Sequence, residues 1–156
     1  MEFEHITPAE WAYFAGIIDG EGCINIHAQK SRKGEKVFVY YTLFLVVGNT
    51  SYSMLKWLHD RFGGSFVPRG NTVTQKQIWH WGVASQQAEN LLRNILPYLV
   101  AKVDQAELAL QFRDSYKGLK PCGRRPLPIE ISEFRGKCKI ELSRIKNPNE
   151  SKEDVA

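Results

Sequence analysis

Residues 11–22 read WAYFAGIIDGEG, and the rest of the chain is organised around this stretch. A helix start precedes it, because Thr7 offers an N-cap hydroxyl, Pro8 suits the first helical position and Glu10 completes a capping box. The stretch itself is mainly apolar and ends in two glycines around a carboxylate. The pattern therefore predicts a helix that ends at these glycines.

One face of the predicted helix carries almost no side-chain bulk. The large apolar residues can pack into a core: Trp11, Phe14, Ile17 and Ile18. The small residues leave a second stripe almost bare: Ala12, Ala15, Gly16 and Gly20. Gly16 and Gly20 are one helical turn apart, a spacing that lets a second backbone approach closely. Because Asp19 and Glu21 stand at the foot of this stripe, two such helices side by side would bring their acids together.

Residues 14–22, FAGIIDGEG, resemble the signature of the LAGLIDADG homing endonucleases. Phe replaces the first Leu, Ile the second Leu, Gly the second Ala and Glu the second Asp, and each exchange keeps size or charge class. The resemblance extends from about Pro8 to about Ile145. The motif occurs once, and single-motif chains of that family act as homodimers. An ordinary amphipathic helix with a glycine end is the alternative interpretation, which chain length and basic charge disfavour.

Composition indicates one globular domain. The 156 residues are 43% hydrophobic and 24% charged, which suits a single domain over residues 1–146 followed by a disordered tail, 147–156. The net charge of +4 becomes +6 without the acidic tail, which modestly favours a polyanionic partner. Three cysteines without CxxC spacing argue against a disulfide framework or a zinc site. We therefore expect a soluble, intracellular protein, in a prokaryotic cytoplasm or an organelle, with no membrane span.

The order of predicted elements defines an α+β fold. Alternation over 23–29 and a β-branched run over 37–47 predict a hairpin around a charged turn, 30–36. The remaining predicted elements are a helix at 52–62, strands at 65–69 and 73–83, and helices at 85–96, 102–116 and 128–145. The economical packing is one four-stranded antiparallel sheet with helices on one face. The resemblance implies the same αββαββα core, with extra C-terminal helices and a saddle-shaped sheet that lies in the DNA major groove.

Hydrolysis of a phosphodiester benefits from divalent cations, which activate water and neutralise charge on phosphorus oxygens. Mg²⁺ prefers oxygen ligands and needs few carboxylates when a phosphate takes part. The resemblance implies that Glu21 is the metal ligand, joined by the backbone carbonyl of Gly20, and that Mn²⁺ or Ca²⁺ can substitute in binding. A solvated acid after a helix is the alternative for Glu21. The resemblance makes Asp19 a structural acid at the dimer interface.

Two further groups are candidates for the reaction. Lys102 resembles the lysine that the family places beside the scissile phosphate, where it stabilises charge. Asn49, at the end of the second predicted strand, matches a polar position of the family's active site. The alternatives are a surface lysine at a helix start and a helix cap, and for Asn49 the cap is equally favoured.

Base recognition is expected on the exposed strand face, where amide and imidazole groups can meet base edges. The candidates are Asn25, His27, Gln29, Tyr40, Thr42, Arg69, Gln75 and Gln77. A solvated sheet face is the alternative for each of them. In a regular strand Gln75 and Gln77 would share a face with Trp79 and Trp81, which are expected to pack in the core, so one of these assignments requires a bulge.

Phosphate contacts are expected from the basic segment 117–146, which holds nine Lys and Arg against three Glu. Lys137 and Lys139 are the candidates on its predicted helix, and a solvated basic face is the alternative.

We therefore expect a homodimeric, metal-dependent endonuclease that cleaves both strands of a long, roughly palindromic double-stranded DNA site. An intron RNA maturase and a non-catalytic DNA-binding regulator on the same fold are the rival hypotheses.

Overall fold

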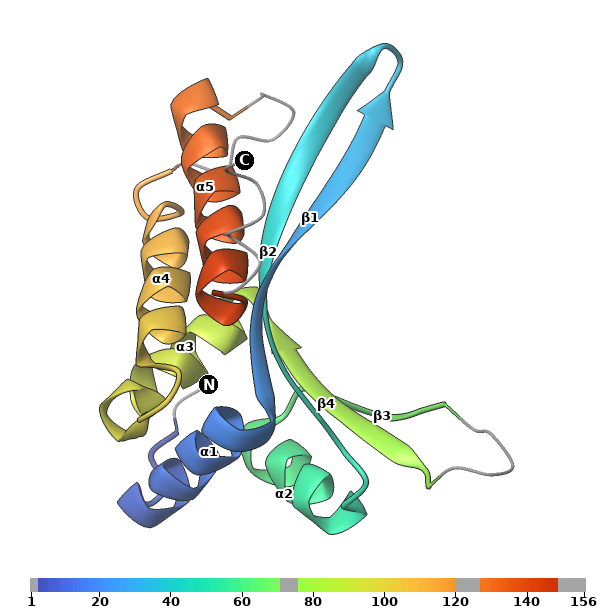
Figure 1. The fold of residues 1–156 in the computed structure, drawn as a ribbon, viewed down its shortest axis with the longest axis vertical. Helices are drawn as coiled ribbons and strands as arrows, with labels where there is room; N and C mark the ends of the chain where they lie inside the picture. Colours follow the sequence, from blue (N-terminus) through green and yellow to red (C-terminus); the bar gives the residue numbers. More distant parts are fainter. Residues whose placement is uncertain (1–2, 71–75, 120–126, 149–156) are drawn as a thin grey trace.

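The computed structural model of the chain describes residues 3–70, 76–119 and 127–148. These residues form five α-helices and one four-stranded sheet (Figure 1). In chain order the elements are α1 (Pro8–Glu21), β1 (Gly22–Lys33), β2 (Lys36–Asn49), α2 (Tyr52–Phe62), β3 (Ser65–Arg69), β4 (Ile78–Ala84), α3 (Ser85–Ile95), the 3₁₀ turn η1 (Leu96–Tyr98), α4 (Val103–Asp114) and α5 (Ile129–Lys146). None of the described helices is long and apolar enough to cross a membrane.

The predicted start and end of α1 are confirmed. The Thr7 hydroxyl accepts a hydrogen bond from the Glu10 backbone N–H at 3.3 Å, and the Glu10 carboxylate accepts one from the Thr7 N–H at 2.9 Å. At the other end the Gly22 N–H donates to the Ile18 carbonyl, and the chain then enters β1 directly. A Cβ on Gly22 would lie 2.7 Å from the Ile18 Cα, so only glycine fits at this junction.

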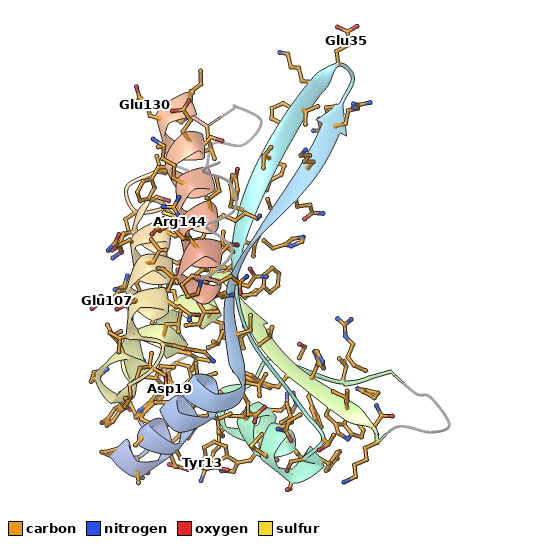
Figure 2. The ribbon with its side chains drawn as sticks, viewed as in Figure 1. Tyr13, Asp19, Glu35, Glu107, Glu130 and Arg144 are labelled. Atoms are coloured by element: carbon orange, nitrogen blue, oxygen red, sulfur yellow. The ribbon has the colours of Figure 1, made fainter. Side chains whose placement is uncertain are left out.

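The sheet is antiparallel in the order β1-β2-β4-β3. The β1–β2 hairpin is longer than predicted, because the charged segment expected as a turn continues as paired strand up to Lys33 and Lys36. Only Gly34 and Glu35 form the turn, and Gly34 has a φ of 61°. Charged side chains at this hairpin tip remain solvated, as Figure 2 shows for Glu35, so strand pairing there requires no burial of charge.

One face of the sheet, called here the inner face, packs against the helices and builds the core, as the sequence predicted. The two hairpins diverge on the other side of the molecule, so that the outer face of the sheet is left uncovered (Figure 1). The fully buried side chains of the inner face include Ile24, Leu43, Leu45, Val47 and Trp81. They meet apolar residues from the helices, among them Phe14, Ile18, Leu55, Phe62, Leu91 and Phe112.

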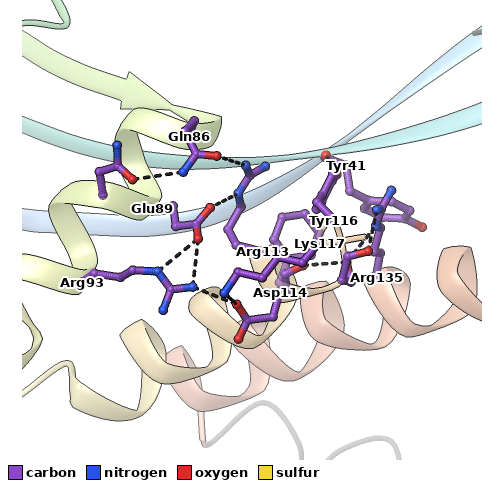
Figure 3. A network of polar contacts seen from close by, with 12 residues as sticks. Tyr41, Gln86, Glu89, Arg93, Arg113, Asp114, Tyr116, Lys117 and Arg135 are labelled. Carbon is purple, nitrogen blue, oxygen red and sulfur yellow. Dashed lines mark hydrogen bonds and ion pairs between the residues drawn. The ribbon is translucent and has the colours of Figure 1, made fainter. Parts of the chain in front are cut away.

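A network of paired charges joins the helices behind the sheet (Figure 3). Glu89 of α3 is only 5% exposed and accepts hydrogen bonds from Arg93 at 2.8 and 3.1 Å and from Arg113 of α4 at 3.0 Å. The Tyr116 hydroxyl donates to the Tyr41 carbonyl of β2 at 2.6 Å. The network therefore ties α3, α4 and the sheet into one body.

Two sequence predictions fall in part outside the described residues. In the described chain β4 begins at Ile78, and residues 71–75 lie outside the described part, so the expected strand start and Gln75 have no observed position. Of the expected tail, 147–156, only the first two residues are described.

Candidate active site and nucleic-acid interface

Strand register decides which side chains lie on the outer face. Asn25, His27 and Gln29 are exposed there and alternate along β1 with residues of the inner face, among them the buried Ile24 and Ile26. Residues that pair across antiparallel strands share a face. Gln29 pairs with Tyr40 and His27 pairs with Thr42, so Tyr40 and Thr42 also lie on the outer face. The structure therefore brings these five candidates together.

The second hairpin adds Arg69, which pairs with Ile78 on the outer face and is exposed. The amide nitrogen of Gln77 donates to the carbonyls of Arg69, Gly70 and Ile78 at 2.8–3.4 Å, and its contact with a base stays a prediction. This amide closes the end of the hairpin. Trp81 is buried and Trp79 partly buried on the inner face, as expected for packing residues.

Charge on the outer face has one sign. The strand positions that the register places there are Cys23, Asn25, His27, Gln29, Ser31 and Lys33 of β1, Lys36, Phe38, Tyr40, Thr42, Phe44, Val46 and Gly48 of β2, Ile78, His80, Gly82 and Ala84 of β4, and Ser65, Val67 and Arg69 of β3. These paired positions include lysine, arginine and several hydrogen-bonding groups but no carboxylate. Such a surface suits a polyanion that presents both phosphates and base edges.

Glu21 occupies the last position of α1, immediately before the sheet, and is exposed. Among the described residues its carboxylate has no hydrogen-bond or ion-pair partner. Gly20 lies in the final helical turn, where backbone carbonyls lack an intrahelical partner. Both groups offer oxygen atoms, the donors that Mg²⁺ prefers. The described part of one chain contains no group of three His, Cys, Asp or Glu side chains placed to hold a metal ion.

Asp19 fastens the segment after η1 to the end of α1. Its carboxylate accepts hydrogen bonds from the backbone N–H groups of Val100 at 2.7 Å, Ala101 at 3.2 Å and Lys102 at 3.0 Å. Figure 2 shows Asp19 near the junction of α1 with the sheet. The expected structural role is confirmed within one chain; its place at a dimer interface stays a prediction.

Lys102 is held at the end of α1 as a consequence. Its ammonium donates to the carbonyl oxygens of Ile18 at 2.8 Å and Gly22 at 2.6 Å. A cation is favourable at a helix C-terminus, where carbonyl dipoles accumulate. An ammonium has three N–H donors, so one remains for another acceptor beside Glu21. These bonds bridge a sequence separation of about eighty residues, and the place of Lys102 beside the scissile phosphate stays a prediction.

Asn49 plays the structural role that the sequence left open. Its side-chain oxygen accepts a hydrogen bond from the Ser51 N–H at 2.8 Å, and the Ser51 hydroxyl in turn caps α2. Asn49 pairs with Trp79, which places its backbone position on the inner face. The cap of α2 is therefore Ser51, Asn49 supports the turn before it, and a direct role for Asn49 in catalysis stays a prediction.

The exposed stripe of α1 is narrower than predicted. Ala12, Gly16 and Gly20 are exposed, and a Cβ added to either glycine would meet nothing within 4 Å. Ala15 is fully buried inside its own chain, because it lies on the side of the helix that faces the core. Beside the stripe lies Val100, an apolar side chain that is 86% exposed and that no sequence pattern marked as part of an interface.

Lys137 and Lys139 lie on α5, away from the outer face, and their contacts with phosphate stay a prediction. Gly136 approaches the Tyr41 hydroxyl of the inner face, so α5 lies on the helical side and carries Lys137 and Lys139 there. Lys146, at the C-terminal end of α5, is different, since its ammonium contacts the Cys23 sulfur on the outer face at 3.3 Å. No local pattern marked this lysine, because its position depends on how α5 crosses the β1 edge.

Several solved structures share this fold. The homing endonuclease I-CvuI, crystallised with DNA, is 20% identical with a TM-score of 0.64, over 88% of this chain and 82% of that one. The archaeal intron-encoded homing endonuclease I-Vdi141I, also in complex with DNA, is 16% identical with a TM-score of 0.70, over 88% and 84%. The LAGLIDADG meganuclease I-CpaMI bound to uncleaved DNA is 18% identical with a TM-score of 0.56, over 85% of this chain but 49% of that one. No protein-family model and no curated protein matches the sequence.

The protein therefore has the fold of the LAGLIDADG homing endonucleases. The α1 segment FAGIIDGEG, which resembles the family signature, ends at the start of the sheet in this fold.

Proposed function

We propose that the protein is a LAGLIDADG homing endonuclease that cleaves both strands of a long, roughly palindromic double-stranded DNA site with divalent cations. The observation that carries this proposal is the carboxylate of Glu21, which has no partner among the described residues. It stands at the end of the exposed α1 stripe, next to a sheet face whose paired strand positions carry no carboxylate. The DNA seen in complex with I-CvuI and I-Vdi141I is consistent with a nucleic-acid partner for this fold.

In this proposal, residues in different parts of the chain bind DNA, bind the cation and contact the phosphate. The outer face binds DNA in the major groove, with Asn25, His27 and Gln29 directed at base edges. Glu21 and the Gly20 carbonyl bind Mg²⁺, for which Mn²⁺ or Ca²⁺ can substitute in binding. The cation lowers the pKa of water and neutralises charge on the phosphate. Lys102, fixed by two carbonyl oxygens, offers its remaining N–H to the phosphate or to nearby water.

Two copies of the chain are required, because one chain supplies one Glu21 and one half of the DNA contacts. The exposed positions Ala12, Gly16 and Gly20 lie one turn apart and let a second α1 approach closely. Val100 and Tyr13, both more than half exposed, would be buried in the same contact. I-CpaMI supports this stoichiometry, since this chain spans 49% of that longer chain. The intron-encoded I-Vdi141I suggests that this protein is also borne by an intron.

The proposal is tested with the full chain, Mg²⁺ and a library of double-stranded DNA, beside Glu21→Gln. We expect wild type to cut both strands of a subset of sequences, and E21Q to bind the same DNA without cutting it. An equal melting temperature of the two proteins serves as the control for folding. DNA binding without any cutting by wild type would favour a regulator, and preference for structured intron RNA would favour a maturase; either outcome would contradict the proposal.

The dimer is tested by sedimentation of Gly16→Leu. A leucine on the exposed stripe has free space within its own chain but would collide with a second helix, so we expect a folded monomer that no longer cuts DNA. Glu107→Leu, on the exposed face of α4, is the matched control and should remain a dimer. An unchanged dimer for G16L would contradict this interface.

A further inference from the structure

Val100 is an apolar side chain that its own chain leaves in solvent. It is almost fully exposed, although the backbone around it is fixed. The N–H groups of Val100, Ala101 and Lys102 all donate to the Asp19 carboxylate, which holds this segment against the end of α1. Because the segment is ordered before any further contact forms, burying the valine costs little additional conformational entropy. Val100 is therefore a preorganised contact point two residues before Lys102.

The Val100 segment and α2 lie on opposite sides of the exposed α1 stripe. At about 3.6 residues per turn, Asp19 and Tyr13 stand about 60° to either side of Gly16 on the helix. On one side Asp19 holds the Val100 segment. On the other side the Tyr13 ring meets Trp57 of α2, with ring centroids 5.0 Å apart. The stripe therefore has two different flanks.

The α2 helix runs antiparallel to α1 along its flank. Arg61 is paired with Glu10 at 2.7 Å. Trp57, about one turn earlier in α2, meets Tyr13, almost one turn later in α1. Continuing this order by one more turn of α2 places the exposed Ser53 beside the last two turns of α1. Both flanks therefore present side chains near the C-terminal end of α1.

The two-fold symmetry of the proposed dimer decides which flanks meet. Two α1 helices that bring both Glu21 carboxylates to one cleavage centre lie side by side and point in the same direction, with the symmetry axis between them. Rotation by half a turn about this axis places the Asp19 flank of one protomer opposite the α2 flank of the other. The contact is therefore between unlike surfaces, and it occurs twice in the dimer.

We propose that Val100 of each protomer packs against the α2 segment 53–57 of a second copy of the chain and thereby acts as a positioning residue for Lys102. This inference rests on the proposed homodimeric endonuclease and deepens it. The partly buried Met54 and Trp57 offer apolar surface within that segment. Lys102 follows Val100 by two residues and is bonded to the carbonyls at the end of α1. The partner's α2 therefore covers the side of the lysine segment that its own chain leaves open.

The first test is a thiol cross-link between two separately prepared proteins, Val100→Cys and Ser53→Cys, in which the cysteines other than the buried Cys138 are replaced by serine. After subunit exchange, a short bismaleimide should join a V100C chain to an S53C chain. V100C alone should give no covalent dimer, because the two valine positions lie on opposite sides of the α1 pair. Glu107→Cys mixed with S53C is the matched control and should not be linked. A covalent V100C homodimer, or no product between V100C and S53C, would overturn the inference.

The second test measures the monomer–dimer equilibrium of Val100→Ala by sedimentation at several protein concentrations. Because the contact occurs twice, loss of both valine side chains should raise the dissociation constant of the dimer about 10- to 100-fold. Ile140→Ala, which removes an exposed apolar side chain of α5, is the matched control and should leave the constant unchanged. A V100A dimer as tight as wild type would contradict the inference.

A third measurement separates the positioning of Lys102 from dimer formation. At protein concentrations that keep V100A fully dimeric, its single-turnover cleavage rate should lie about three- to tenfold below wild type, while DNA affinity in EDTA stays within about twofold. In a Lys102→Met background V100A should have no further effect on the rate, and equal effects in both backgrounds would contradict the positioning role.

The outcomes distinguish this inference from the proposed function. If G16L remains a dimer, the α1 interface of the proposed function fails and this inference fails with it. If G16L is a monomer but V100C links to itself and not to S53C, the proposed interface stands and the inference fails alone.

Discussion

Two glutamates of this molecule stand in opposite surroundings. Glu89 is 5% exposed on the helical side and accepts hydrogen bonds from both Arg93 and Arg113. Glu21 is exposed at the end of α1 and has no partner among the residues that the structure describes. The Glu89 carboxylate has its hydrogen-bond partners within the chain. The Glu21 carboxylate is available to a ligand from outside the described chain.

The contrast extends to the regions around them. Behind the sheet, arginine side chains are paired with carboxylates, stacked on Tyr116 or bonded to backbone carbonyls. On the outer face Asn25, Gln29 and His80 make no hydrogen bond within the described chain. A buried charge must be paired, since an unpaired one is costly. Groups left unpaired at the surface therefore mark where a ligand is expected, and the following predictions test this division.

Substitution of Lys102 gives the largest expected effect on cleavage, because this lysine both bonds the end of α1 and carries a positive charge beside Glu21. Lys102→Met removes two charge-assisted hydrogen bonds to the α1 carbonyls and the cation beside Glu21. We expect single-turnover cleavage to fall about 10²- to 10³-fold and the free energy of unfolding to fall by about 2 kcal/mol. Lys56→Met, which removes an exposed lysine of α2 outside the proposed DNA contacts, is the control. A stability loss without a loss of cleavage would assign Lys102 to structure alone.

Glu89 should affect stability and not the reaction. Glu89→Gln leaves two guanidinium groups beside a neutral amide in a nearly buried site, and we expect the free energy of unfolding to fall by about 3 kcal/mol. Urea denaturation measures this, with Glu107→Gln on the exposed face of α4 as control. The folded fraction should still cleave DNA. A stability change under about 0.5 kcal/mol would mean that the network is not structural.

The same residue predicts a pH dependence. Burial by itself raises the pKa of Glu89, but hydrogen bonds from Arg93 and Arg113 outweigh burial and hold the pKa below its usual 4.5. A carboxylate with a lowered folded-state pKa stabilises the protein above the unfolded pKa, and this contribution is lost as pH falls through the folded pKa. Wild type should therefore lose more unfolding free energy than E89Q between about pH 5 and pH 3. Parallel pH profiles would contradict this assignment.

Asn25 represents the outer face and gives the smallest expected effect. Asn25→Ala removes an exposed amide that has no partner in the described chain, so the melting temperature should not change. Affinity for the target DNA should fall about tenfold, the size expected for one base contact. Ser132→Ala, on the helical side, is the control for binding. A variant with unchanged affinity would place the DNA contacts elsewhere.

Local sequence determined much of this protein. The capping box of Thr7 and Glu10 starts α1, and the glycines after Ile18 end it, since these effects act within one helical turn. Alternation over residues 23–29 correctly assigned Asn25, His27 and Gln29 to the outer face, because side chains in a strand alternate between faces. The α+β order of elements follows from the same two periodicities.

Only the tertiary structure decided the remaining features. Ala15 belongs to a stripe of small residues in sequence, yet the rotation of α1 against the sheet turns it into the core. Lys102 reaches the end of α1 because Asp19 binds the segment before it, and His80 reaches Gly48 because β2 pairs with β4. These contacts join residues 32 to more than 80 positions apart, and no local periodicity encodes which distant backbone will lie beside which side chain.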